Sequence, residues 1–497
     1  MGESLSILVK LTPSTEVMIL DNFARQLRQE AQRWRDEGII SSSQYEQIAD
    51  RHQFKKIEGS AKESSELIPI AFGGLLLILG IVIFLAANWQ TWSREVKFIL
   101  LMSLFLSTAI TGFLTWREPT LSREKKGEDK KSKPGKRFLG EGLLLVSSLI
   151  LGATLVLMAE IFNISGSPTQ LFLAWGFGVL IMAYSLCINS LGILAILLLQ
   201  IGYWLGLGEF SVTDGNFTSS DLNWAQLAVR HTPLISWVLF VPLAYICRSR
   251  IIFILAAIAF TFSLQYNLQP LPLLTSSDIF PWVASFALAL PPALFWSYDD
   301  LLFPTVNYRL FQGIARYFAL GCFAVVFYLL SFRWQWQSLD FGNSSSSFNN
   351  LSTGFQSLSI IDLGIIGGLV FIQWLFLFRH RREAFFTLTV IGIFLGFIVI
   401  VPFWHQGIGR ITELGIFIFN SLLFTLSWGL IQEGLKLSSR TPFWCGMMLL
   451  ILQIISRILE YDTDLLFRSL VFVICGSGLI SAGLWFEGRL QERTVKK

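Results

Sequence analysis

The sequence predicts an all-α fold: a polytopic transmembrane helix bundle of about 14 spans, preceded by a small helical hairpin in the cytoplasm. Two observations predict this fold. Apolar residues make up 53% of the 497 residues and charged residues only 14%, whereas about a quarter of the residues in a soluble domain are charged. From residue 67 onward, apolar runs long enough to cross a bilayer alternate with short turns, while residues 1–66 are polar.

The polar N-terminal segment, residues 1–66, is predicted to form a hairpin of two helices followed by a linker. Apolar residues recur at helical spacing up to Trp34, and Gly38 is a typical residue just past a helix C-terminus. Ser41 and Gln44 have the spacing of a capping box at the start of a second helix. So small a hairpin buries little core, so we expect it to dock on a protein partner, on its own membrane domain or on a second copy. The second helix offers little basic charge, and nucleic acid is not an expected partner.

Residues 67–486 are predicted to form the membrane domain. Its spans are expected at 67–87 and 96–116, and then at about 140–161, 171–188, 191–208, 233–247, 251–268, 282–298, 315–332, 360–378, 384–404, 411–431, 442–458 and 467–486. Prolines interrupt two of them: Pro291 and Pro292 should break or kink one span, and Pro242 another. Such helices either line a cavity, as in transporters, or are ordinary packed kinks.

The most basic part of the chain is a predicted loop, residues 117–139. It begins at Arg117 and carries a run of lysines up to Arg137. Cytoplasmic loops are enriched in Lys and Arg, so we expect this loop, the N-terminal head and the tail at 487–497 to be cytoplasmic in a bacterial inner (plasma) membrane protein. The loop is either a topology signal alone or also a contact with anionic lipids of the bilayer.

A candidate polar site lies at the predicted outer end of the third span. Glu160, Asn163 and Ser165 follow one another there, and Asn88 and Trp89 form the turn after the first span. Ionisable groups inside a membrane are costly and invite a functional reason. The alternative is a helix end that meets lipid headgroups, where a carboxylate costs little.

A candidate inter-helix ion pair lies at another predicted outer turn, where Arg457 precedes Asp462 and Arg468 follows it. Its simplest interpretation is a pair that holds two helices together. Asp362, also near a span end, is expected to be solvated at the membrane interface.

Enzyme signatures are absent from the sequence. The four histidines, His52, His231, His380 and His405, are scattered, and neither they nor the cysteines show a metal-binding spacing. The phosphate-binding, nucleophile-elbow and dinucleotide-binding glycine motifs are missing as well. The sequence therefore predicts a protein that is not an enzyme and needs no cofactor or metal.

Three stretches carry a resemblance to the bacterial membrane protein family called domain of unknown function 2157. They are Trp34, Gly38-Ile39-Ile40 and Gln44-Tyr45 in the head, Ala86-Ala87-Asn88-Trp89 at the first turn, and Gly140-Glu141-Gly142, Ala159-Glu160-Ile161-Phe162-Asn163-Ile164-Ser165-Gly166 and Trp175 in the third and fourth spans. The resemblance implies a cytoplasmic helical domain followed by a polytopic bundle, and it implies no activity. Glu160 departs from the family, which is expected to have Gln at this position.

Two functions compete on these grounds. The many spans, the proline-interrupted helices and the polar helix ends favour a transporter or a lipid- or small-molecule-handling protein. The alternative is a membrane scaffold or assembly protein that recruits a partner through its N-terminal head. An intramembrane enzyme acting on lipid-linked substrates is the weakest hypothesis, because the turn after the first span has Glu95 as its only carboxylate.

Overall fold

The computed structural model describes residues 33–35, 37–39, 41, 43–45, 91–125, 134–163, 166–213, 224–268, 281–299, 310–336, 353–380, 385–461 and 464–495. The chain divides into two units, residues 1–97 and 98–497. All regular structure in the described part is helical, with no strand. The all-α prediction is therefore confirmed there.

The described residues of the first unit centre on the turn at Gly38. Its φ of +75° is left-handed, and the N–H groups of Ile39 and Gly38 donate to the carbonyls of Trp34 (2.8 Å) and Arg35 (3.1 Å). This is the pairing by which a left-handed glycine ends a helix. The predicted capping box is also present, because Gln44 Oε1 accepts from Ser41 N at 2.9 Å and Ser41 Oγ from Gln44 N at 3.3 Å. Most of both flanking helices lies outside the described residues, so the hairpin stays a prediction.

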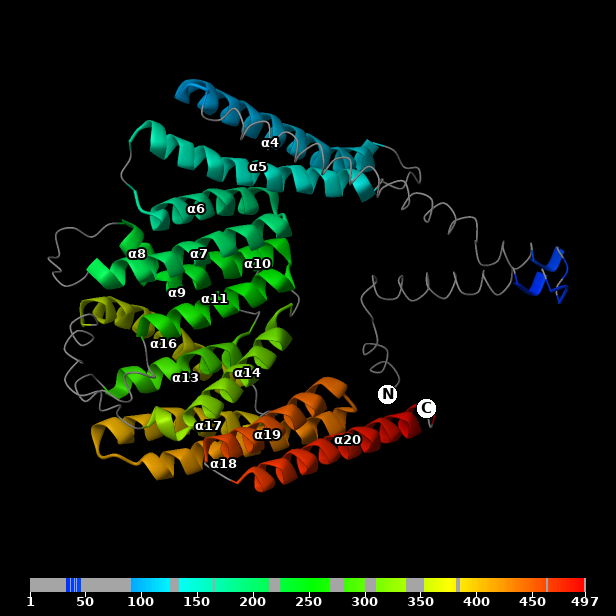
Figure 1. Ribbon diagram of the computed structural model, residues 1–497, viewed down its shortest axis with the longest axis vertical. Helices are drawn as coiled ribbons and strands as arrows, with labels where there is room; N and C mark the ends of the chain where they lie inside the picture. The colour runs from blue at the N-terminus through cyan, green and yellow to red at the C-terminus, as the bar shows by residue number, and fades with distance from the viewer. Residues whose placement is uncertain are drawn as a thin grey trace. The chain divides into compact units, whose positions relative to one another are not determined.

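The second unit is a series of helices joined mostly by short turns (Figure 1). In chain order they are α4 (Arg94–Lys125), α5 (Pro134–Ile161), α6 (Pro168–Leu186), α7 (Asn189–Thr213), α8 (Trp224–Arg230), α9 (Thr232–Ile235), the π-helix η2 (Ser236–Phe240), α10 (Val241–Cys247), α11 (Arg250–Leu268), α13 (Pro281–Ser297), α14 (Gln312–Leu330), the 3-10 helix η4 (Arg333–Gln335), α16 (Thr353–His380), α17 (Phe385–Gly407), α18 (Thr412–Leu437), α19 (Arg440–Glu460) and α20 (Leu465–Val495).

Among the described residues, eleven helices are long and apolar enough to cross a membrane, and twelve if the bent pair that contains α8 and α10 counts as one span. The apolar helix α13 is shorter, and the predicted span at 67–87 lies outside the described residues. A multi-span membrane protein is therefore confirmed, while the count of about 14 stays a prediction.

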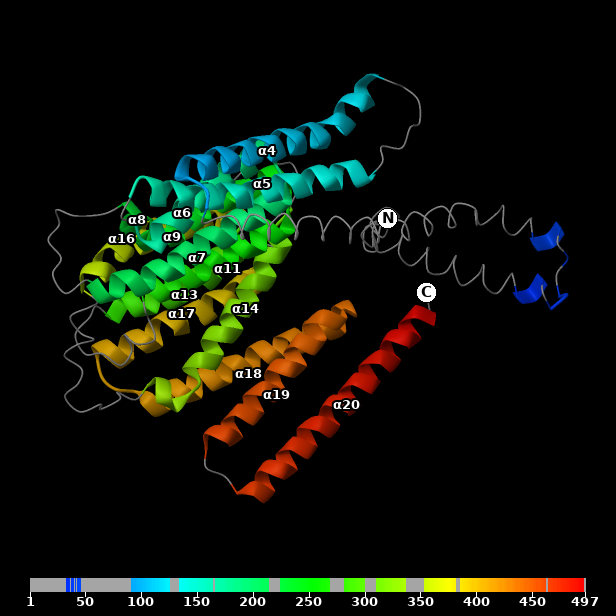
Figure 2. The ribbon, with the colours of Figure 1, turned by 45° about the horizontal axis from the view of Figure 1, so that its top comes forward.

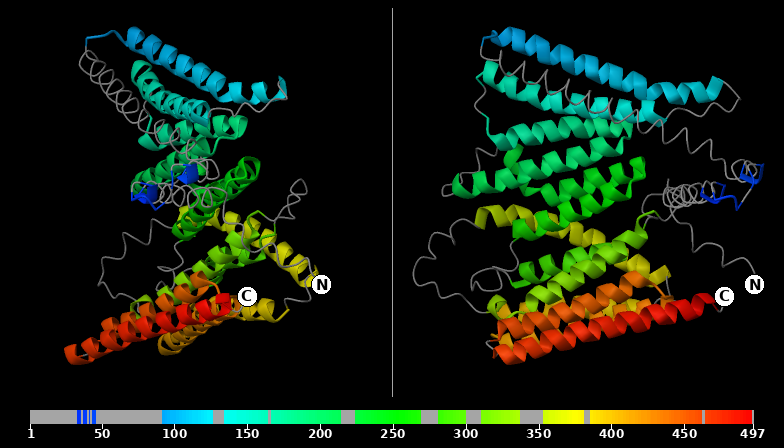
Figure 3. Two further views of the ribbon diagram at one scale, coloured as in Figure 1. Left: turned by 90° about the vertical axis from the view of Figure 1, so that its right-hand side faces the viewer. Right: turned by 45° about the vertical axis from the view of Figure 1, so that its right-hand side comes forward.

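The core of this unit forms where α13 meets α11, α14, α16 and α17, and where α6 packs on α7 (Figure 3). Its largest fully buried side chains are aromatic. Among them, Phe253 stacks on Phe311, and Phe295 lies edge-on to the partly buried Phe318. The last helix, α20, contacts the others mainly through α19, where Phe486 stacks on Phe443 with ring centroids 4.0 Å apart (Figure 2). Elsewhere α20 exposes apolar side chains such as Leu466 and Leu484, as expected for a surface that faces lipid.

The connection between α4 and α5 corrects a sequence prediction. Residues 117–139 were expected to form a basic loop, but α4 continues to Lys125 and α5 already begins at Pro134. The apolar spans themselves are Arg94–Arg117 and Phe138–Ile161. Both helices therefore run beyond their apolar portions into the basic segment, because Lys, Arg and Glu are good helix formers and a change to polar residues does not end a helix.

The proline pair in α13 also differs from the prediction, since the helix runs unbroken from Pro281 to Ser297 through Pro291 and Pro292. Proline has no N–H, so Pro291 leaves the carbonyl oxygen of Ala287 without its helical donor. The side-chain amide of Gln265 on α11 donates to this oxygen at 2.6 Å. A neighbouring helix thus replaces the lost hydrogen bond, which is how transmembrane helices tolerate proline.

Gly152 of α5 lies directly against the indole ring of Trp175 of α6, which donates from Nε1 to Ser148 O at 2.8 Å. A Cβ atom at Gly152 would overlap the ring. We expect Gly152→Ala to lower the stability by about 1–3 kcal/mol, measured as a lower unfolding temperature in detergent. Gly142→Ala on the same helix is the control, because no atom lies within 4 Å of its new Cβ. Equal stability of the two variants would contradict this packing.

Candidate functional site

The span that contains α8 and α10 is broken at His231. The helix axes on either side of the break differ by 74°, and His231 has non-helical dihedral angles of φ −93° and ψ 17°. Pro233 explains the position of the break, because it cannot donate a hydrogen bond to the carbonyl oxygen of Val229. The chain then passes through α9 and the π-helix η2 before Pro242 in the first turn of α10. The predicted interruption near Pro242 is thus present as a π-helix, while the sharp bend lies further upstream.

A buried amide covers the carbonyl groups at this break. Nδ2 of Asn267, on α11, donates to the carbonyl oxygens of Arg230 at 2.8 Å and Val229 at 3.4 Å. Its Oδ1 atom accepts from the hydroxyl of Tyr203, on α7, at 2.7 Å. Both side chains are buried. The broken helix is therefore held by specific hydrogen bonds to two neighbouring helices.

His231 also contacts Asp362 of α16, at 2.8 Å between Nδ1 and Oδ1, and the two form an ion pair when His231 is protonated. The Asp362 side chain is 1% exposed and that of His231 is 26% exposed. The second carboxylate oxygen, Oδ2, has no hydrogen-bond partner among the described residues. The prediction that Asp362 is solvated at the interface is wrong, because α8, α9, α11 and α13 pack against α16 and exclude water from it. The pair places an ionisable group inside the protein at a break in a helix.

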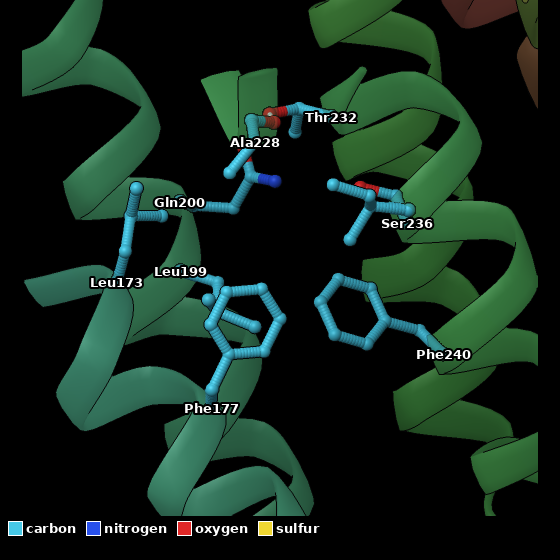
Figure 4. A pocket seen from close by; sticks show the side chains of 9 residues that line it. Leu173, Phe177, Leu199, Gln200, Ala228, Thr232, Ser236 and Phe240 are labelled. Carbon is cyan, nitrogen blue, oxygen red and sulfur yellow. Dashed lines mark hydrogen bonds between the residues drawn. The ribbon is translucent and has the colours of Figure 1, made fainter. Parts of the chain in front are cut away.

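A small cavity adjoins the same broken span (Figure 4). The centre of a water molecule has about 10 Å³ to occupy there, which is close to the space that one water needs. Apolar groups, including the rings of Phe177 and Phe240, close one end, and Gln200, Thr232 and Ser236 line the other. Gln200 Nε2 and Ser236 Oγ are buried without hydrogen-bond partners in the described part of the chain. The cavity therefore has polar groups that could bind a water.

The polar site predicted around Glu160 is only partly described. Glu160 lies at the exposed end of α5, and Asn163, also exposed, has a left-handed backbone with φ +49°. The Asn163 N–H donates to the Glu160 carbonyl oxygen at 3.4 Å, while no partner of the Glu160 carboxylate is found among the described residues. Asn88, Trp89 and Ser165 lie outside the described residues. Only two of the five residues are described, so the candidate site and its role stay a prediction.

The predicted ion pair near the C-terminus has a different described partner. Arg457 pairs with Glu460 on its own helix, and Arg457 Nη1 donates to the Ser331 carbonyl oxygen at 2.5 Å. Its guanidinium lies 4.2 Å from the centre of the Phe332 ring. Asp462 lies outside the described residues, and Arg468 is in the first turn of α20. Arg457 therefore connects α19 to the end of α14, as a helix staple would.

The broken span has a weak local signal in the sequence, and its contact between His231 and Asp362 has none. Pro233 two residues after His231 indicates a possible helix break. His231 and Asp362 are 131 residues apart, however, and no short motif contains both. Their contact depends on the packing of α16 against α8 and α9.

Comparison with protein families tests the resemblance. The family model described as "Predicted membrane protein (DUF2157)" matches residues 32–192. The resemblance to DUF2157 is confirmed. The DUF2157 match includes Glu160 and Asn163 but neither His231 nor Asp362. Comparison with curated proteins and with solved structures gives no match. The chain is an integral membrane protein, and the DUF2157 match assigns it no activity.

The Asn267 amide should stabilise the broken span. We expect Asn267→Leu to cost about 1–3 kcal/mol, because it leaves the carbonyl of Arg230 without its donor and the Tyr203 hydroxyl with only the longer contact to the Ser263 carbonyl oxygen at 3.3 Å. Tyr203→Phe is the matched control, since it removes one hydrogen bond and leaves Asn267 on both carbonyls, at a cost of about 1 kcal/mol. Unfolding temperatures in detergent compare the two. A smaller loss in Asn267→Leu than in Tyr203→Phe would contradict this role.

The Arg457–Glu460 pair should matter more than the exposed pair between Arg440 of α19 and Glu487 of α20. Arg457→Met leaves the largely buried Glu460 carboxylate without its cation, at an expected cost of about 2–4 kcal/mol. Arg440→Met breaks the exposed pair of Arg440 with Glu487, which should cost about 0–1 kcal/mol. The measurement is again the unfolding temperature. Equal effects would show that Arg457 is not a staple.

Proposed function

We propose that this protein is a transport-like membrane protein that handles a small molecule or a lipid at the broken span around His231. The observation that carries the proposal is the buried His231–Asp362 pair at a 74° break. In transporters, broken helices present helix ends and unpaired backbone groups to a substrate site. Ionisable residues in a membrane domain are costly, and they mark substrate or proton pathways. A static bundle gains nothing from a carboxylate that has one oxygen unpartnered.

The position of this site follows from the orientation of the chain, which is itself part of the proposal. The basic segment between α4 and α5 and both termini are assigned to the cytoplasm of a bacterial inner membrane protein. Consecutive spans alternate in direction, so the end of α8 that carries His231 and the end of α16 that carries Asp362 face outward. The basic segment itself is proposed to contact anionic lipids at the opposite surface.

A membrane scaffold is the second candidate function, and the ordered turn of the N-terminal head supports it. The left-handed Gly38 and the capping box of Ser41 and Gln44 support a tight turn between the two predicted helices of the head. A head of this kind buries little apolar surface by itself. A protein partner that covers it would give the chain a recruiting function.

Native mass spectrometry of the protein, gently extracted from its own membrane, tests the proposal. We expect the full chain to retain one defined small molecule or lipid, and Asp362→Asn to lose it. Glu413→Gln is the control, because Glu413 also lies near a span end but is exposed and only loosely paired with Arg333 at 3.4 Å. A stoichiometric protein partner that is lost on removal of residues 1–55, with no bound small molecule, would contradict transport and support the scaffold.

A further inference from the structure

We propose that the His231–Asp362 pair is a proton-binding site, which takes up and releases one proton at the Nε2 atom of His231. The inference deepens the proposed function by naming the proton as its coupling ion, and only the coupling rests on that function. The site itself consists of three observed features: the contact of Nδ1 with Oδ1, the buried carboxylate and the partly exposed imidazole.

The hydrogen bond of 2.8 Å between Nδ1 and Oδ1 contains one proton, which we assign to Nδ1. With that proton on Nδ1, His231 is neutral, Nε2 has a free lone pair and Asp362 is negative. A second proton, taken from water, forms an N–H bond at Nε2 and makes the ring an imidazolium. The pair then has no net charge, and release returns the proton from Nε2 to water.

The surroundings explain why the pair should titrate. A buried carboxylate without a compensating cation is strongly unfavourable at low dielectric, and the added proton supplies that cation. The His231 side chain is 26% exposed, whereas that of Asp362 is 1% exposed. The exchanging group therefore lies at the surface of the protein, and the charge that holds the proton is buried.

Among the described residues, the helices packed against α16 carry few titratable groups. α8 carries Arg230, α9 and α13 carry none, and α11 carries Tyr266, next to Asn267, and Arg250 at its opposite end. On α16 itself, Arg379 and His380 lie at the far end. Arg230 is 2% exposed and adjoins His231 in the chain. Its fixed positive charge should weaken proton binding, which gives the proposal a second, opposite test.

The site is also placed to couple protonation to a conformational change. His231 is itself the residue at which the span bends, and its ring is attached to a different helix through Asp362. A change of charge on His231 therefore alters the attraction between the bend of this span and α16. Proton binding would thereby shift the angle between the two halves of the span.

Histidine NMR on the purified full-length protein tests the proton site. Each 13C-labelled histidine ring reports its own protonation, and His231→Gln identifies the His231 signal, with His380 and His405 as internal references. We expect His231 to titrate. Asp362→Asn should lower its proton affinity by about tenfold or more, because the buried negative charge is gone. Arg230→Gln should raise the affinity, and Glu413→Gln should leave it unchanged.

Two results would overturn the proton site: a His231 signal that does not titrate while the other histidines do, or an affinity that is the same in folded Asp362→Asn and wild type. If Asp362→Asn does not fold, the wild-type titration and the opposite shift in Arg230→Gln decide. A titrating His231 in a protein that binds no small molecule supports the proton site and contradicts the proposed function. A protein that holds a bound molecule but whose His231 does not titrate supports the proposed function and contradicts the proton site.

Discussion

Inside a bilayer, each backbone N–H and C=O group has to find its hydrogen-bond partner within the protein, and two proline positions put this constraint to the test. Pro291 deprives the carbonyl of Ala287 of its donor, and Pro233 does the same to the carbonyl of Val229. One helix, α11, supplies hydrogen-bond donors at both positions. Its Gln265 donates to Ala287 O and its Asn267 to the carbonyls of Val229 and Arg230. Residues two apart on a helix point to nearly opposite sides, so α11 supports α13 and the broken span at once.

The two helices respond differently to proline, and the difference has functional consequences. In α13 the helix continues, because the surrounding helices hold it on several sides. At His231 the helix breaks, and the freed chain turns by 74°. The break exposes one face of an imidazole while α16 buries its carboxylate partner. Proline thus lies within a continuous helix at one position and at a break beside a candidate proton site at the other, and the neighbouring side chains differ between the two positions.

Much of the fold was predictable from local patterns in the sequence. Apolar runs of span length predicted the helices, because the bilayer thickness sets that length. In the head, Gly38 indicated the end of the first helix and Ser41 the start of the second. The helix ends in the basic segment were less predictable, since the apolar span stops at Arg117 while the helix continues to Lys125. Trp336 shows the same limit: Trp beside an apolar run is typical of a membrane interface, whereas this ring is buried beside His405 and Phe419.

Apolar run length and turn residues act locally, so local patterns were enough to predict a multi-span membrane protein with a polar head and a DUF2157-like N-terminal part. Which ionisable groups are buried depends instead on the packing of helices that are distant in the chain. Asp362 looked like an interfacial carboxylate by its position near a span end, yet four packed helices enclose it and present His231 to it. The burial and pairing of Asp362 depend on a contact with a residue 131 positions away in the chain. A pattern of neighbouring residues carries no information about such a contact.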